Sequence, residues 1–216
     1  MGWIRRYDMS VPDERSVGID LAADAVRRGE LVVLPTDTVY GIGADAFSHD
    51  AVGALLAAKG RGRDMPVPVL VGAPRTLDGI ATHLSTTARA LVEAFWPGAL
   101  TVVATVQPSL QWDLGDTGGT VAVRMPLHPV AIALLQATGP LAVSSANVTG
   151  KPPATSCDEA VEQLGESVGL YLDGGPSGDA VPSTIVDVTG TVPRLLRLGA
   201  VPIEALREVV PDLETG

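Results

Sequence analysis

Three cationic side chains lie close together in the segment Lys59-Gly60-Arg61-Gly62-Arg63. Cations at the end of a helix are ordinarily stabilised by its dipole, by ~0.3–1 kcal/mol each, which is the alternative explanation. The two glycines, however, favour a loop that approaches a ligand closely rather than a continuing helix. Arginine side chains bind phosphate and carboxylate oxygens bidentately. The segment therefore predicts a site for a polyanion.

A fourth candidate cation, Arg124, ends the apolar strand pattern of residues 120–124. A half-buried arginine needs an anionic or polar partner, because burying an unpaired charge is costly. The partner is either a carboxylate of this protein or a carboxylate or phosphate of a substrate. The sequence does not decide between these two alternatives.

Two polar segments directly follow apolar, strand-like runs. Residues 35–43 read Pro-Thr-Asp-Thr-Val-Tyr-Gly-Ile-Gly, and residues 144–150 read Ser-Ser-Ala-Asn-Val-Thr-Gly. Ligands of α/β proteins tend to bind beyond strand ends, although the first segment taken alone is better explained as a capped turn. The pair Gly150-Lys151 is not a P-loop, because Ser145 replaces the first glycine and Pro152 follows the lysine. No dinucleotide fingerprint, nucleophile elbow or kinase signature is present.

Composition excludes several functional classes. A formal net charge of −10 argues against a protein whose whole surface binds nucleic acid. Cys157 is the single cysteine, and the three histidines lack metal-ligand spacing, so we expect no metal site. The longest uncharged run, residues 129–150, is interrupted by turn and polar residues and is unlike a membrane span. With no signal-peptide pattern at the N-terminus, we expect a cytoplasmic protein with no membrane partner.

Hydrophobic patterning predicts the elements that position these residues. Helices are expected at 16–28, 48–58, 85–95, 128–138, 157–164 and 202–209, and strands at 31–35, 67–71, 99–106, 120–124, 141–144, 168–172, 184–188 and 194–198. Pro68 restricts the second of these strands to a sheet edge or a strand start. The interleaving predicts an α/β fold, and the short connection between the last two strands predicts a mixed sheet. One domain over residues 1–216 is expected, with its core at roughly 17–206.

Taken together, the ordered motifs resemble the YrdC family of threonylcarbamoyl-AMP synthases. The matching segments are Pro-Thr-Asp-Thr-Val-Tyr-Gly (35–41), Lys-Gly-Arg (59–61), Trp-Pro-Gly-Ala-Leu-Thr (96–101), Val-Ala-Val-Arg-Met-Pro with His-Pro (121–129), Ser-Ser-Ala-Asn with a following glycine (144–150), Ser-Thr-Ile-Val-Asp (183–187) and Leu-Arg-Leu-Gly-Ala (196–200). The resemblance implies a twisted α/β fold with a deep, positively lined cavity. It also implies synthesis of threonylcarbamoyl-AMP and pyrophosphate from L-threonine, bicarbonate and ATP, with Mg²⁺ accompanying ATP. Because the motifs end near residue 206, the chain resembles the short, single-domain form of the family.

The resemblance assigns roles to eleven residues. It places Lys59, Arg61, Arg63, Thr120, Asn147, Thr155 and Arg197 around ATP, with Lys59 and Arg61 as the catalytic pair. It places Thr36, Arg124, Ser145 and Ser183 around threonine. The chain departs from the family where Gly62 replaces a proline, Met65 replaces a lysine or asparagine, and no histidine follows near residue 70. These departures concern the recognition of threonine.

Two other functions fit parts of the pattern. A cationic cavity could serve a double-stranded RNA or tRNA-binding module, although the acidic net charge and the 4% aromatic content oppose this as the sole function. A carbamoyl-adenylate-forming maturation enzyme would use related chemistry, usually within a much longer chain. For the synthase itself, the family implies a downstream tRNA threonylcarbamoyltransferase as partner and leaves room for weak direct binding of tRNA.

Overall fold

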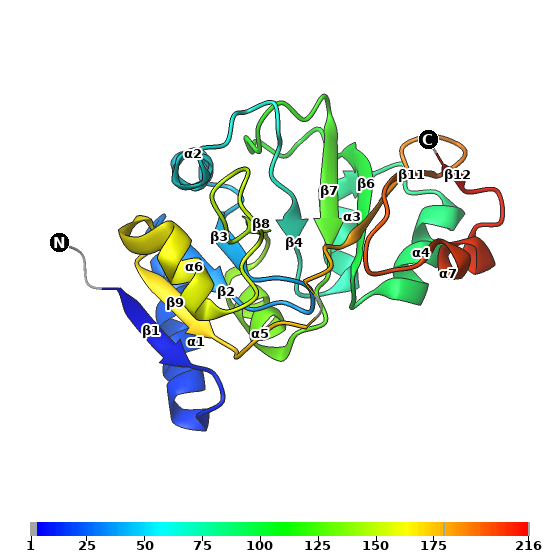
Figure 1. Ribbon diagram of the computed structural model, residues 1–216. Coiled ribbons are helices and arrows are strands. Elements are labelled where there is room, and N and C mark those ends of the chain that lie inside the picture. Colours follow the sequence, from blue (N-terminus) through cyan, green and yellow to red (C-terminus); the bar gives the residue numbers. More distant parts are fainter. Residues whose placement is uncertain (1–3, 179, 216) are drawn as a thin grey trace.

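A single mixed sheet runs through the computed structural model, which describes residues 4–178 and 180–215 (Figure 1). The strands are β1 (Arg5–Asp8), β2 (Val32–Leu34), β3 (Gly41–Asp45), β4 (Val69–Leu70), β5 (Ala81–Thr82), β6 (Leu100–Val106), β7 (Thr120–Arg124), β8 (Leu141–Ser145), β9 (Leu170–Asp173), β10 (Thr184–Asp187), β11 (Arg194–Arg197) and β12 (Glu214–Thr215). Their order is β1-β9-β2-β3-β8-β4-β7-β6-β10-β11-β12, with β5 on β6. Because β2–β3 and β10–β11 are antiparallel and β2–β9 is parallel, the predicted mixed α/β sheet is confirmed.

Helices cover the sheet at the six predicted segments, and one further short helix, Leu77–Ile80, was not predicted. They are α1 (Pro12–Arg27), α2 (His49–Lys59), α3 (Leu77–Ile80), α4 (Thr86–Phe95), α5 (Pro129–Thr138), α6 (Cys157–Leu164) and α7 (Ile203–Val209), with short 3₁₀ turns at Pro74–Thr76 and Gly165–Ser167. Ser48, Ser85 and Ser156 cap α2, α4 and α6 with their hydroxyls. None of the described helices is both long and apolar enough to cross a bilayer.

Alternating strand residues feed two hydrophobic clusters. Val32 and Leu34 of β2 join one cluster with apolar residues of α1 and α5, whereas Val33 joins a second cluster with residues of α2, α4, α6 and α7. β8 and β9 divide their residues in the same way. This is the period of two that a strand buried on both faces requires, since successive side chains point to opposite faces.

The sheet differs from the sequence prediction at several places, among them the short strands β5 and β12, which were not predicted. β1 pairs with β9 at the sheet edge beyond the predicted core, and α1 begins at Pro12, a residue suited to the first turn of a helix. Residues 41–45, part of the polar segment expected to be a turn, form β3 in the middle of the sheet. The strand 69–70 also lies inside the sheet, but it starts directly after Pro68, as the proline required.

Gly41 of β3 is explained by packing against the neighbouring strand and not by a turn. A Cβ on Gly41 would lie 2.6 Å from Cγ1 of Val143 on the neighbouring strand β8. A Cβ on Gly43 would come no closer than 3.4 Å to its neighbours. Gly41 therefore leaves room for the side chain of Val143 on the paired strand β8, and the low strand propensity of glycine hid this element from the sequence pattern.

We predict that Gly41→Ala destabilises the fold by ~1–3 kcal/mol, because the β-branched Val143 has few other rotamers to adopt. The matched variant Gly43→Ala should change the free energy of unfolding by no more than about 1 kcal/mol. Urea unfolding followed by circular dichroism measures both. Equal stability losses in the two variants would contradict this account of β3.

Candidate active site

A cavity of about 430 Å³ opens among β3, β4, β6, β7, β8, β10 and β11 and loops adjoining them, chiefly those that lead into β3, β4 and β10. Its charged lining side chains, within the part of the chain that the structure describes, are the arginines Arg61, Arg124 and Arg197. Aliphatic hydroxyl groups add hydrogen-bonding capacity; these are Thr36, Thr38, Thr101, Ser144, Ser145 and Ser183. Guanidinium and hydroxyl groups in one half-enclosed space suit a small polyanionic ligand.

Arg124 is held at the end of β7 by three separate partners. Its side chain is 8% exposed, and its guanidinium donates to Oδ1 of Asp37 at 2.6 Å and to Oγ1 of Thr38 at 2.9 Å. Nε donates to the carbonyl of Gly98 at 2.9 Å. The partner sought from the sequence is therefore a protein carboxylate. Burial lowers the pKa of Arg124 and Asp37 opposes that shift.

Arg124 nevertheless keeps capacity for a ligand. A guanidinium has five N–H donors, and its bonds to described residues use three of them. Because the side chain also lines the cavity, the remaining donors can reach a bound carboxylate. Asp37 accepts a further hydrogen bond from the backbone N–H of Leu127 at 2.9 Å, which ties the loop after β2 to the turn after β7.

Lys59 lies behind the cavity wall rather than in it. It ends α2 and is 2% exposed, and its ammonium donates to the carbonyl of Ser145, to the carbonyl of Asn147 at 2.6 Å and to the amide oxygen of Asn147 at 3.4 Å. Burial, with a smaller effect of the nearby Arg61 charge, lowers its pKa to about 8. Lys59 thus shapes the turn after β8 that presents Ser145.

Arg61 reaches the cavity because α2 ends abruptly. Gly60 adopts a left-handed conformation (φ 59°) as the C-cap, which turns the chain back after Lys59. The guanidinium of Arg61 then donates to Oγ of Ser144 at 2.9 Å and to the carbonyls of Met65 at 2.7 Å and Pro66 at 3.0 Å. Burial lowers the pKa of Arg61, so an anion beside it would relieve part of the cost of desolvation.

Ser183, just before β10, and Arg197, at the end of β11, line another part of the cavity. The guanidinium of Arg197 donates twice to the carbonyl of Ser183, at 2.7 and 3.0 Å, and once to its hydroxyl at 3.2 Å. That hydroxyl also pairs with the hydroxyl of Thr101 at 2.8 Å. Burial lowers the pKa of Arg197. Hydroxyl and cation are therefore fixed to each other before any ligand arrives.

Five of the eleven residues assigned from the resemblance do not line the cavity, and Lys59 behind its wall is the first of them. Asn147 also lies behind this wall, bound to Lys59. Arg63 points outward and pairs with Asp113, Thr120 donates to the carbonyl of Thr117 at 2.8 Å, and Thr155 donates to Glu159 at 3.0 Å. Thr36, Arg61, Arg124, Ser145, Ser183 and Arg197 do line it. Their roles toward substrates stay predictions.

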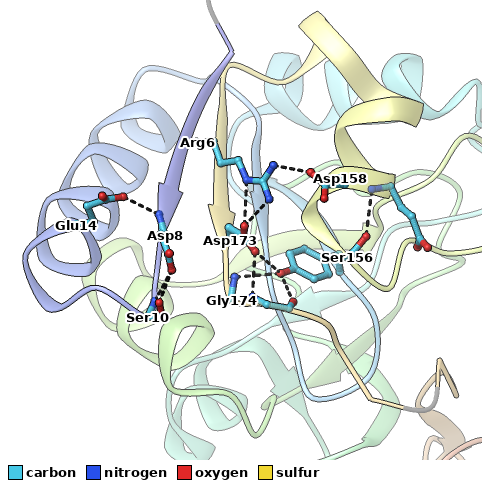
Figure 2. A network of polar contacts seen from close by, with 11 residues as sticks. Arg6, Asp8, Ser10, Glu14, Ser156, Asp158, Asp173 and Gly174 are labelled. Carbon is cyan, nitrogen blue, oxygen red and sulfur yellow. Dashed lines mark hydrogen bonds and ion pairs between the residues drawn. The ribbon is translucent and has the colours of Figure 1, made fainter.

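Residues without an assigned role from the sequence complete the site, and most of them belong to the motifs already noted. Tyr40 lines the cavity and anchors its loop, since its hydroxyl donates to the carbonyl of Gly175 at 2.5 Å and accepts from the N–H of Gly174 at 3.0 Å. Figure 2 shows Asp173, next to this anchor, bound by Arg6 of β1. The sequence motifs point to these residues, but they do not reveal the hydrogen-bond partners, which lie far away in the sequence.

No group of three His, Cys, Asp or Glu side chains within residues 4–178 and 180–215 is arranged to hold a metal ion. The lining of the cavity, as described, also includes no carboxylate. A divalent cation would have to bind there through the oxygens of its ligand.

Comparison with known proteins places this geometry in a family. The family model for Sua5, YciO and YrdC proteins, which carries the description "Telomere recombination", matches residues 24–199. A Mycobacterium tuberculosis protein named as a candidate threonylcarbamoyl-AMP synthase is 58% identical over 204 residues, covering 94% of each chain. The Bacillus subtilis threonylcarbamoyl-AMP synthase is 37% identical, covering 95% of this chain and 61% of that protein.

A solved structure agrees with the sequence matches. The crystal structure of Pyrococcus abyssi Sua5 complexed with L-threonine superposes with a TM-score of 0.92 at 34% identity. The match covers 99% of this chain and 62% of that one. The chain therefore spans about the same share of the P. abyssi protein as of the B. subtilis protein.

We predict that Asp37→Ala costs ~3–5 kcal/mol of stability, because it leaves the buried guanidinium of Arg124 without its counter-charge. Asp24→Ala is the matched control, since Asp24 pairs with Arg27 on an exposed helix face and should change stability by less than about 1 kcal/mol. Chemical unfolding of the three proteins measures the difference. A loss for Asp37→Ala no larger than that of the control would refute the structural role of this ion pair.

Proposed function

The chain belongs to the Sua5, YciO and YrdC family, and we propose that it is a threonylcarbamoyl-AMP synthase. It joins L-threonine, bicarbonate and ATP into threonylcarbamoyl-AMP and pyrophosphate. The product is the activated intermediate for N6-threonylcarbamoyladenosine modification of tRNA, which a downstream threonylcarbamoyltransferase completes. The reaction takes place in the cytoplasm.

The observation that carries this proposal is the cavity with arginines as its charged side chains and hydroxyls between them. ATP and threonine both bring negative charge, and guanidinium groups that are partly desolvated, without carboxylates to neutralise all of them, favour such ligands. The threonine bound to P. abyssi Sua5, together with the names of the relatives, supports threonine as one of the two.

The reaction needs no protein nucleophile. The amino nitrogen of threonine attacks the carbon of bicarbonate, a C–N bond forms and water leaves, which yields an N-carboxylate. A carboxylate oxygen then attacks the α-phosphorus of ATP, and the bond to the β-phosphate oxygen breaks to release pyrophosphate. The protein contributes orientation and charge stabilisation, which are effective in a site that is already organised and partly dehydrated.

Each wall of the cavity has a role in this scheme. Arg124, with Thr36, Ser145 and Ser183, binds the carboxylate and polar groups of threonine. Arg61 and Arg197 contact the phosphates, and Lys59 with Asn147 holds the turn at Ser145 in place. The described lining has no carboxylate, so Mg²⁺ arriving with ATP would be held through the oxygens of its ligand and would offset phosphate charge there.

The decisive test is pyrophosphate release from ATP by the purified protein, with and without L-threonine and bicarbonate. Release that requires both substrates supports the proposal. Release that requires neither would indicate a general nucleotidase, and carbamoyl phosphate replacing threonine would indicate carbamoyl-adenylate chemistry. Salt-sensitive tRNA binding without any pyrophosphate release would favour the RNA-binding alternative.

We predict that Arg61→Ala lowers threonine-dependent pyrophosphate release by ~100-fold or more, the usual loss when a preorganised charge-stabilising group is removed. Lys59→Ala should lower it as well, because the turn that presents Ser145 loses the ammonium that holds it. Lys151→Ala is the matched control, because it replaces the only other lysine and Lys151 is exposed. Initial rates at saturating substrates, with circular dichroism to check folding, measure the effect. Turnover within a few-fold of wild type in Arg61→Ala would rule out its role.

A further inference from the structure

The loop of residues 60–67 presents Arg61 to the cavity, and its sequence does little to order it. It contains Gly60 and Gly62, which enlarge the conformational freedom of the chain. Two of the three hydrogen bonds of the Arg61 guanidinium go to carbonyls of this loop, those of Met65 and Pro66. The direction of the guanidinium therefore depends on where the backbone of residues 65–66 lies.

Residues 113–116, which we call the brace, bind this loop through the backbone. The N–H of Val67 donates to the carbonyl of Leu114, and the N–H of Asp116 donates to the carbonyl of Arg63, both at 2.8 Å. Leu114 is 2% exposed and belongs to the main hydrophobic cluster. The brace is thus itself anchored in the core, and its backbone holds the loop at two points, Arg63 and Val67.

Gly115 lets the brace and the loop touch. A Cβ at this position would lie 2.8 Å from the carbonyl oxygen of Arg63 and 3.2 Å from Cα of Pro66, and its φ of +101° suits glycine alone. The two segments are therefore in backbone contact, and any side chain larger than hydrogen on Gly115 would displace the loop that carries Arg61.

The side chain of Arg63 adds an ion pair to the contact between the loop and the brace. Its guanidinium binds both carboxylate oxygens of Asp113, at 2.7 and 2.9 Å, and lies 3.6 Å from Asp116. It is 56% exposed and is not part of the cavity lining. Its charge is met by two carboxylates of the brace, unlike the charge of Arg61.

We infer that the brace and Arg63 position the loop so that Arg61 faces the nucleotide, and that Arg63 is a positioning residue rather than a ligand of ATP. Asp113, Gly115 and Asp116 thereby become determinants of ATP affinity although none of them lines the cavity. The inference rests on the proposed function only in assigning ATP to the cavity. The two possible roles of Arg63 predict opposite consequences of removing Asp113.

A double-mutant cycle separates these roles. The probe is a non-hydrolysable ATP analogue with Mg²⁺, and its dissociation constant is measured by calorimetry for Arg63→Ala, Asp113→Ala and the double variant. We expect each single variant to weaken binding by ~2- to 5-fold, the effect of an exposed ion pair. The double variant should bind no more weakly than either one, because a single contact is lost in all three.

If Arg63 bound the triphosphate, Arg63→Ala would weaken binding while Asp113→Ala left it unchanged or tightened it, and the inference would be wrong. Gly115→Ala is an independent variant, and it should weaken binding more than either ion-pair variant. The control is the exposed pair of Asp78 and Arg89, 2.8 Å apart and distant in the sequence from both segments. Asp78→Ala and Arg89→Ala should leave the affinity unchanged.

Hydrogen exchange provides a readout that does not depend on ligand. The amides of Val67 and Asp116, bonded across the contact, should exchange faster in Arg63→Ala, Asp113→Ala and Gly115→Ala than in wild type and the two controls. Unchanged exchange would refute the brace even if affinity falls. If the wild-type protein bound no ATP analogue, the proposed function would be refuted. Hydrogen exchange of the Val67 and Asp116 amides would still test whether the brace holds the loop.

Discussion

The ion pair of Arg124 and Asp37 joins the loop after β2 to the end of β7, two strands that are not neighbours in the sheet. Arg124 ends β7, Asp37 follows β2, and the same guanidinium binds the carbonyl of Gly98 just before β6. Because a charge shielded this well from water is tolerated only with partners, these loops must come together for the fold to be stable. The cavity is the space left between them, so one electrostatic requirement sets both the fold around the site and the shape of the site.

Cations that are wholly or partly buried are used here in two distinct ways. The ammonium of Lys59 donates to backbone oxygens at the end of β8 and in the turn after it, and so holds that turn in place. Arg61 and Arg124, in contrast, line the cavity. A cation already desolvated and oriented by protein oxygens needs little reorganisation when an anion arrives. This arrangement suits a reaction in which negative charge moves between phosphates and no protein atom forms a covalent bond.

The contacts that support the site extend to the edge of the sheet at β1. The loop with Tyr40 is tied to β9 through Gly174 and Gly175, next to the pairing of Arg6 with Asp173 that holds the edge strand β1 (Figure 2). On the other side, residues 113–116 hold the loop with Arg61. Residues that touch substrates are therefore ordered by neighbours that do not, a division that favours precise placement of the side chains in the cavity.

The sequence by itself determined the α/β class, most helices and strands and the family, because these depend on periodicity and motifs within a few residues of each other. Tertiary structure decided the rest. It made residues 41–45 a central strand, paired Arg124 with Asp37 across 87 positions, buried Lys59 and turned Arg63 toward Asp113. Charge and hydrogen-bonding capacity are properties of a single residue. The partner that satisfies them depends on which strands lie side by side, and local sequence patterns do not contain that information.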